Sequence, residues 1–370
     1  MISLNLIVLI PALMCFFALF FNNKTSNWFF WLSILFAVLF SFLRYDLGGD
    51  YVAYYKLYQY PAFYSIDIFL KDYSSTDIGF DVLVYISSSL GLGFNLFLAL
   101  ITLSQLLILN CVLKKFPENN KFAVFMFFFI FFGSYFLNLV VLRQGLSAAF
   151  FFLAVFFVTE KKYFLSIISY LLGCLFHKGL LFFFPFLFFG FFPVYRYFYI
   201  FLAALTFLVI LIPVNQYSIV LEIFGLESFS SYLDKEGEYN SGVTGIVRVF
   251  VLLIVIFFGF FLKSSFEKRV YIFVVAYFCF SIFGMKIPYA DRLSCYFSFF
   301  VPVCLGFIYC RMKPGSKFLL ILLILLSFNF SLLLRQSSYF YNEYKVFFNK
   351  DDLLMDELSV EKYRLLKNTN

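Results

Sequence analysis

Apolar runs of roughly 20 residues recur from one end of this 370-residue chain to the other. A bilayer core about 30 Å thick takes about 20 helical residues to cross, so each run is long enough to span it. Backbone polar groups in hydrocarbon need internal hydrogen bonds, and the runs lack the alternation of a barrel strand. The sequence therefore predicts an all-α, polytopic integral membrane protein.

The composition excludes several other classes of protein. The chain is 63% hydrophobic and only 13% charged, with a mean hydropathy of +0.93. So few charges cannot cover the surface of a soluble domain of this length. No basic stripe suggests nucleic acid as a partner. The seven cysteines lie in or beside apolar runs without CxxC spacing, so we interpret them as small buried residues.

We expect about 12 transmembrane helices in a single membrane domain, residues 1–334. The predicted spans are 2–21, 27–43, 94–113, 122–141, 144–158, 163–179, 180–193, 197–213, 246–262, 270–285, 293–310 and 318–334. A shorter and more polar helix over 79–92 is expected to be re-entrant or interfacial. Two long segments, 44–78 and 214–245, are too polar to cross, and a polar tail occupies residues 335–370.

The orientation follows from lysine and arginine in the short loops. If 79–92 does not cross, the loops on one side carry 13 basic residues against three acidic ones. Such loops stay in the cytoplasm, so both long segments and the tail are expected to face outward. If 79–92 did cross, Lys114, Lys115 and Lys121 would move to the outer side, which argues against a crossing.

Arg143 places a permanently charged guanidinium between two apolar helices. A charge near hydrocarbon costs at least about 2.5–3.5 kcal/mol on insertion scales, so it usually faces a cavity or a partner. The small residues Gly145 and Ser147 would let neighbouring helices approach closely. An interfacial arginine whose charged end reaches water is the alternative interpretation.

His177 is the only histidine in the chain, and it follows Arg143 by 34 residues. Two helical crossings of about 17 residues each would return the chain to the same level of the membrane. Arg143 and His177 are therefore expected to share the outer mouth of the protein. An imidazole is the natural proton acceptor at neutral pH. A capping or interfacial histidine is the alternative.

The first outer segment begins with Arg44-Tyr-Asp-Leu-Gly-Gly-Asp50-Tyr-Val-Ala-Tyr54. An arginine beside hydroxyl-bearing aromatic side chains suits a sugar or a phosphate. An arginine with an aromatic belt that anchors the protein at the interface is the alternative.

Arg248 and Arg292 lie on the same predicted side, although snorkelling of Arg248 and pairing of Arg292 with Asp291 are simpler interpretations. Together with Arg44 and Arg143, these guanidiniums suit a multiply anionic ligand, because the planar fork binds phosphate oxygens bidentately. A lipid-linked pyrophosphate is the candidate. The chain has no Walker A motif and no second histidine for a His-rich metal site, so we expect no metal.

At these residues the sequence resembles the EpsG-like branch of the Wzy-type bacterial polysaccharide polymerases. The matching pieces are Arg44–Tyr54, Asp77-Ile-Gly-Phe80, Arg143–Ala149, Lys161-Lys162 and Phe176-His177-Lys-Gly179. Weaker similarity extends over residues 245–300. The acidic residue before Gly-Phe is commonly glutamate in the family and is Asp77 here.

The resemblance implies a GT-C-like glycosyltransferase of O-antigen or exopolysaccharide assembly in the bacterial inner membrane. Such an enzyme transfers a growing glycan from undecaprenyl pyrophosphate to the non-reducing end of a new lipid-linked repeat unit at the periplasmic face. Its expected partners are lipid-linked oligosaccharides, membrane lipid and a chain-length regulator. No cofactor is expected, because arginines can stabilise the leaving pyrophosphate.

On this hypothesis His177 takes the proton from the attacking sugar hydroxyl, with Asp50 as the alternative base. Arg143 and Arg292 hold the donor pyrophosphate, and another arginine assists. The candidate binding residues are Arg44, Arg143, Arg248, Arg292 and Tyr54.

Two other functions are considered. A flippase or transporter of lipid-linked sugars would need cationic residues near the bilayer midplane, where this sequence carries almost no charge. An O-antigen ligase would use the same arginine and histidine chemistry, and only the local motifs favour a polymerase.

Overall fold

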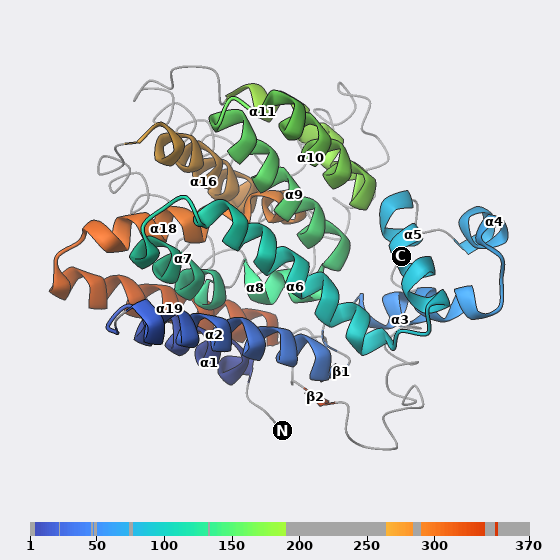
Figure 1. Cartoon of the computed structure of the whole chain (residues 1–370), viewed down its shortest axis with the longest axis horizontal. Coiled ribbons are helices and arrows are strands. Elements are labelled where there is room, and N and C mark those ends of the chain that lie inside the picture. The colour runs from blue at the N-terminus through green and yellow to red at the C-terminus, as the bar shows by residue number, and fades with distance from the viewer. Residues whose placement is uncertain are drawn as a thin grey trace.

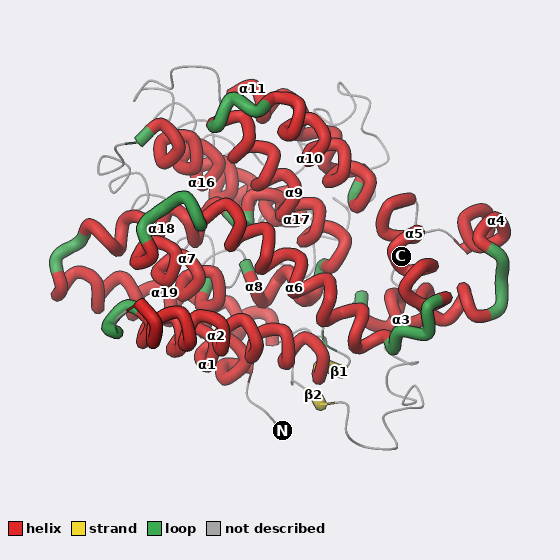
Figure 2. The backbone as a smooth tube through the Cα atoms, in the orientation of Figure 1, coloured by secondary structure: helices red, strands yellow, loops and turns green. Residues whose placement is uncertain are grey.

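The computed structural model describes residues 4–21, 23–45, 47, 50–73, 77–131, 134–189, 264–283, 290–336 and 345–346. These residues are predominantly helical (Figures 1 and 2). The predicted outer segment 214–245, the spans 197–213 and 246–262 and most of the tail 335–370 lie outside them, so the count of 12 spans stays a prediction.

The long helices overlap the predicted spans, although α7 and α18 differ from them in their bounds. They are α1 Leu4–Ala18, α2 Asn23–Leu43, α6 Phe94–Leu113, α7 Glu118–Ile130, α9 Leu142–Thr159, α10 Tyr163–Phe176, α16 Ser265–Phe283, α18 Phe300–Arg311 and α19 Pro314–Gln336. Within the described residues, three helices are both long and apolar enough to cross a membrane, namely 24–43, 94–113 and 142–159. From α7 onward the described residues also form five shorter helices, namely α8 Tyr135–Val140, η3 Lys178–Phe183, α11 Phe184–Phe189, α17 Ala290–Ser294 and η7 Cys295–Phe297.

Large apolar side chains cover the outside of the helices as well as the inside. On α10, Phe164, Ile167 and Leu171 are more than half exposed, and Phe318 and Leu319 are similarly exposed on α19. Water would oppose so much exposed apolar surface, whereas lipid tails accept it. The helical bundle therefore has the surface of a membrane protein.

Two apolar cores hold the helices together. The larger one is built mainly from α1, α2, α6, α7, α9, α16 and α18. A smaller, aromatic-rich core joins α3 Tyr51–Gln59 and α5 Ile78–Ser89 to the first half of α6. In Figure 1, α3, α4 and α5 lie beside one end of the bundle. The described part of the segment between α3 and α5, residues 60–73, contains short helical turns, namely η1 Tyr60–Ala62, α4 Ile66–Ile68 and the π-helical η2 Phe69–Tyr73.

The predicted span 122–141 is not one unbroken helix. The chain leaves the helix after α7, where Phe131 is extended, and restarts as the short α8 after Ser134. Ser134 is fully buried and donates its hydroxyl to the Ser298 carbonyl oxygen at 2.7 Å. The break thus ties this region to the start of α18.

Charged residues gather at the end of the bundle where α6 and α9 finish. Lys115 after α6 forms an ion pair with Glu160 after α9. Glu267 at the start of α16 accepts two hydrogen bonds from Arg311 at the end of α18, at 2.5 and 2.6 Å. We call this end, formed by residues 114–117, 160–162, 264–268 and 311–313, the basic end. It lies one length of α9 from Leu142, about 27 Å at 1.5 Å per residue.

The helix predicted over 79–92 does not cross the bundle. It corresponds to α5, whose 12 residues extend only about 18 Å, well short of a bilayer core about 30 Å thick. The residue before it, Asp77, contacts Arg143 at the start of α9, and Leu92 after it accepts a hydrogen bond from Tyr58. Because α5 does not cross, α6 and α9 can end on the same side. The Lys115–Glu160 ion pair places their ends together, as the orientation argument required.

At Gly306, α18 packs directly against the backbone of α7. A β-carbon there would lie 2.7 Å from the Val124 backbone nitrogen and 2.8 Å from its α-carbon. Overpacking a core usually costs about 1–3 kcal/mol. We predict that Gly306→Ala lowers the thermal unfolding temperature of the detergent-purified protein. Gly315→Ala, where the added carbon meets no atom within 4 Å, is the control, and equal temperatures for both variants would contradict this packing.

Candidate functional site

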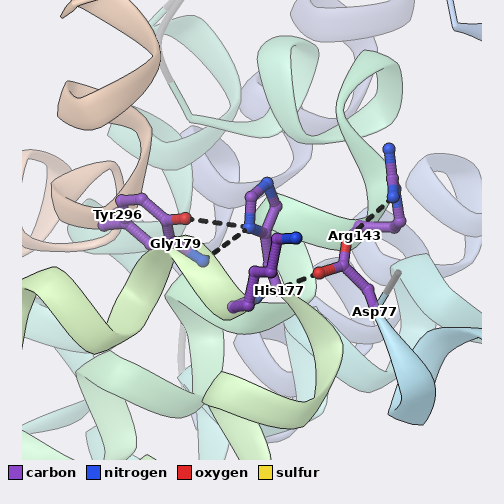
Figure 3. Close-up of polar contacts among 6 residues, drawn as sticks. Asp77, Arg143, His177, Gly179 and Tyr296 are labelled. Carbon is purple, nitrogen blue, oxygen red and sulfur yellow. Dashed lines mark hydrogen bonds and ion pairs between the residues drawn. The ribbon is translucent and has the colours of Figure 1, made fainter. Parts of the chain in front are cut away.

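A buried carboxylate lies at the centre of the polar contacts at the end opposite the basic end. Asp77 precedes α5 and is 3% exposed. Its Oδ2 accepts from Arg143 Nη1 at 2.7 Å, and its Oδ1 accepts from the Lys178 backbone N–H at 3.0 Å. Figure 3 shows Asp77 facing Arg143. One side chain therefore joins α5, α9 and the segment after α10.

Close packing of α5 on α10 brings Asp77 to this position. A β-carbon on Gly79 would lie 2.8 Å from the Leu175 β-carbon and 2.9 Å from its backbone carbon and oxygen. Only glycine allows this approach, which sets the start of α5 against the end of α10. The two short motifs Asp77-Ile-Gly-Phe80 and Phe176-His177-Lys-Gly179, remote in sequence, are thereby in contact.

The Arg143 guanidinium is held from two sides and still reaches the surface. Besides its ion pair with Asp77, it lies 5.7 Å from the centre of the Tyr54 ring, within cation–π range. Its side chain is 26% exposed. A pre-positioned, partly exposed guanidinium is suited to an anionic ligand.

Tyr54 lies beneath this arginine and packs against Phe80, with ring centres 5.5 Å apart. Burial, reinforced by the nearby Asp50 carboxylate, raises the pKa of Tyr54 to about 12. Asp50 precedes α3, is half-buried and makes no side-chain capping hydrogen bond. The α3 tyrosines mainly form the small aromatic core, not the exposed sugar-binding surface that the sequence suggested, and Tyr54 reaches the site through Arg143.

His177 follows α10 and precedes η3, next to Asp77 through its neighbour Lys178. Its Nδ1 accepts from the Gly179 backbone N–H at 3.1 Å, and the Tyr296 hydroxyl lies 3.1 Å from the same nitrogen. Burial lowers the pKa of His177; Asp77 opposes this change, while the positive charges of Arg143, Arg292 and Lys178 add to it. These surroundings favour the neutral imidazole.

The other predicted arginines have different surroundings. Arg292 in α17 is exposed, its carbonyl oxygen accepts from Gln144, and its charge acts on His177. Arg44 in the short strand β1 Arg44–Tyr45 is 1% exposed, donates to the Leu139 carbonyl and lies 6.0 Å from the Tyr51 ring. Strand β1 pairs antiparallel with β2 Lys345–Val346. Arg248 lies outside the described residues.

The binding roles of these arginines stay predictions. Arg143 and Arg292 are the two that the structure brings near His177, whereas Arg44 is packed inside the protein. In the described part of the chain, no three His, Cys, Asp or Glu side chains gather in a way that could hold a metal ion.

Comparison with known proteins identifies the family. The sequence model of the EpsG family matches residues 27–347, which include every residue of the site. The chain belongs to the EpsG family. EpsG-family members are membrane proteins of the polysaccharide polymerase type, and the family is associated with glycosyltransferase-like polymerase activity. No curated protein and no solved structure matches this EpsG-family chain.

Sequence reasoning missed two members of this EpsG-family site. The Asp77-Ile-Gly-Phe80 motif is the only signal that the sequence gives for Asp77, because the segment around it is polar and also carries Asp72 and Asp81. Tyr296 lies in the span 293–310 among many aromatic residues and carries no such signal. Its contact with His177 depends on tertiary packing alone.

The Asp77–Arg143 pair should contribute measurably to stability. Because Asp77 is buried and Arg143 is largely enclosed, we predict a coupling energy of about 1–3 kcal/mol in a double-mutant cycle of Asp77→Ala and Arg143→Ala. The same cycle on the exposed Lys115–Glu160 pair should give less than about 1 kcal/mol. Thermal unfolding in detergent measures both, and equal coupling in the two pairs would be evidence against the arrangement.

Proposed function

We propose that this EpsG-family protein is a polysaccharide polymerase of O-antigen or exopolysaccharide assembly. It transfers a growing glycan from undecaprenyl pyrophosphate to the non-reducing end of a new lipid-linked repeat unit. The observation that carries this proposal is the Arg143 guanidinium, which is anchored by the buried Asp77 carboxylate, partly exposed and close to His177.

The arginine suits the leaving group of this reaction. When the bond between the anomeric carbon and the pyrophosphate breaks, negative charge develops on the pyrophosphate oxygens. A guanidinium that is already in place stabilises this charge without reorganising. Asp77 fixes Arg143 from the protein side, and Arg292 adds a second positive charge near His177. Such a reaction needs no nucleotide sugar, because the lipid-linked glycan is itself the donor.

The attacking sugar hydroxyl must lose a proton as the new glycosidic bond forms. Two side chains near Arg143 are candidates to receive it, namely His177 and the half-buried Asp50. Asp50 precedes the helix that carries Tyr54, and its charge acts on both Tyr54 and Arg143. A carboxylate at this position is suited to act as a general base.

The expected side of the membrane supports the same reaction. Lysine and arginine are retained on the cytoplasmic side of inner-membrane proteins, so the basic end is assigned to the cytoplasm. The Asp77–Arg143–His177 site then opens at the periplasmic leaflet, where flipped lipid-linked repeat units accumulate. Lipid-linked oligosaccharides are the proposed substrates, and a chain-length regulator is the proposed protein partner.

The proposal predicts how substitutions at the site change the length of the surface glycan. In cells that depend on this protein, Arg143→Ala should abolish long surface glycan while single repeat units still reach the surface, and His177→Ala should shorten the chains strongly. Loss of one donor to a developing anion typically lowers turnover by about 100-fold or more. Lys115→Ala, at the basic end, is the matched control and should leave polymer length unchanged.

Gel analysis of the surface glycan separates the alternatives. Undiminished long chains in both site variants would end the polymerase mechanism. Complete absence of surface glycan, single repeats included, would indicate a flippase or a ligase.

A further inference from the structure

The two ring nitrogens of His177 have different surroundings. A backbone N–H can only donate, so the Gly179 N–H at 3.1 Å requires a lone pair on Nδ1. The neutral imidazole, which the surroundings favour, therefore carries its proton on Nε2. In Figure 3, Nδ1 faces Gly179 and Tyr296, while the opposite side of the ring points away from both.

Tyr296 reinforces this assignment. Its hydroxyl lies 3.1 Å from Nδ1, and because that nitrogen is an acceptor, the hydroxyl donates to it. Tyr296 is 1% exposed and packs against Phe183, with ring centres 5.0 Å apart. A β-carbon on Gly179 would lie 2.5 Å from the Tyr296 hydroxyl oxygen. Tyr296 and Gly179 thus form a close-packed pair, and both contact Nδ1.

We propose that His177 acts as an Nε2–H hydrogen-bond donor to the pyrophosphate of the lipid-linked substrate, and not as the base of the reaction. Gly179 and Tyr296 are positioning residues that hold this tautomer. The inference rests on the proposed function and deepens it. It follows because the only lone pair of the neutral ring faces the Gly179 N–H and the Tyr296 hydroxyl, and a base would need that lone pair to face the sugar hydroxyl.

The proton of the reaction then goes elsewhere. The sugar O–H bond breaks and its proton passes to the Asp50 carboxylate, while the sugar oxygen forms a bond to the anomeric carbon. The bond from that carbon to the pyrophosphate breaks, and its electron pair stays on the pyrophosphate. Arg143 and the His177 Nε2–H stabilise the resulting charge. The step needs no other reactant.

Amide substitutions at position 177 distinguish a donor from a base. A glutamine places its amide nitrogen near the position of Nε2, whereas an asparagine reaches only the position of Nδ1. We expect His177→Gln to retain transfer within about 10-fold and His177→Asn to lose about 100-fold or more. The assay uses purified protein with lipid-linked repeat units and measures polymer and released undecaprenyl pyrophosphate. Equal inactivity of both variants, or near wild-type rates in both, overturns the donor role.

Arg143→Ala in the same assay distinguishes failure of the donor role from failure of the proposed function. If Arg143→Ala is inactive while the two His177 variants behave alike, the polymerase assignment stands and the donor role fails. If Arg143→Ala polymerises normally, the proposed function itself fails.

A spectroscopic measurement tests the tautomer without activity. Since the chain has a single histidine, ¹⁵N-histidine labelling of protein purified without a histidine tag gives one pair of ring nitrogens. At neutral pH we expect a protonated Nε2 and an unprotonated Nδ1. A protonated Nδ1 would overturn the inference whatever the activity.

Tyr296→Phe tests whether Tyr296 positions the imidazole. It removes one donor to Nδ1, which destabilises the neutral ring, so the pKa of His177 should rise in the NMR titration while the fold is retained. The charges that face this ring are unchanged in the variant, namely Asp77 on the α5 side, Arg143 on α9, Lys178 in η3 and Arg292 on α17. An unchanged titration would show that the tyrosine does not position the imidazole.

Discussion

The Asp77 carboxylate is almost fully buried at one end of a helical bundle, and a charge in that position needs partners from more than one direction. Arg143 from α9 and the Lys178 N–H after α10 supply them. Because the Asp77 carboxylate accepts a hydrogen bond from each of them, it fixes the relative position of three segments far apart in sequence. The remainder of the site depends on this contact, since Tyr54, His177 and Arg292 all lie around the same guanidinium or imidazole.

The charged groups lie at the two ends of the helices, and the apolar surface lies between these ends. A polar site is therefore compatible with an apolar bundle. The second charged region lies at the other end of α9, about 27 Å away, where ion pairs between loops are partly exposed. The apolar surface between them faces lipid. This arrangement would let the proposed lipid-linked substrate present its pyrophosphate to Arg143 while its hydrocarbon chain stays in the bilayer.

The sequence predicted the parts of this arrangement that depend on local pattern and length. Apolar runs located most helices, and the spacing of two crossings predicted that Arg143 and His177 lie at one level. The local pattern does not predict long-range packing. Nothing in the pattern indicates that Arg44 turns inward to the Leu139 carbonyl, that the 122–141 span breaks, or that Tyr296 meets His177. Such contacts depend on how helices pack in three dimensions, which no single segment encodes.

The central claim is that the Asp77–Arg143–His177 site opens on the side of the membrane opposite the basic end. Cysteine accessibility tests it most directly, in a variant whose seven native cysteines have been replaced. Lys178 and Lys115 are both exposed and lie at the two ends of the bundle, so each receives a single cysteine in turn. A membrane-impermeant maleimide added to spheroplasts should label position 178 and spare position 115. Labelling of position 115 alone would contradict the account.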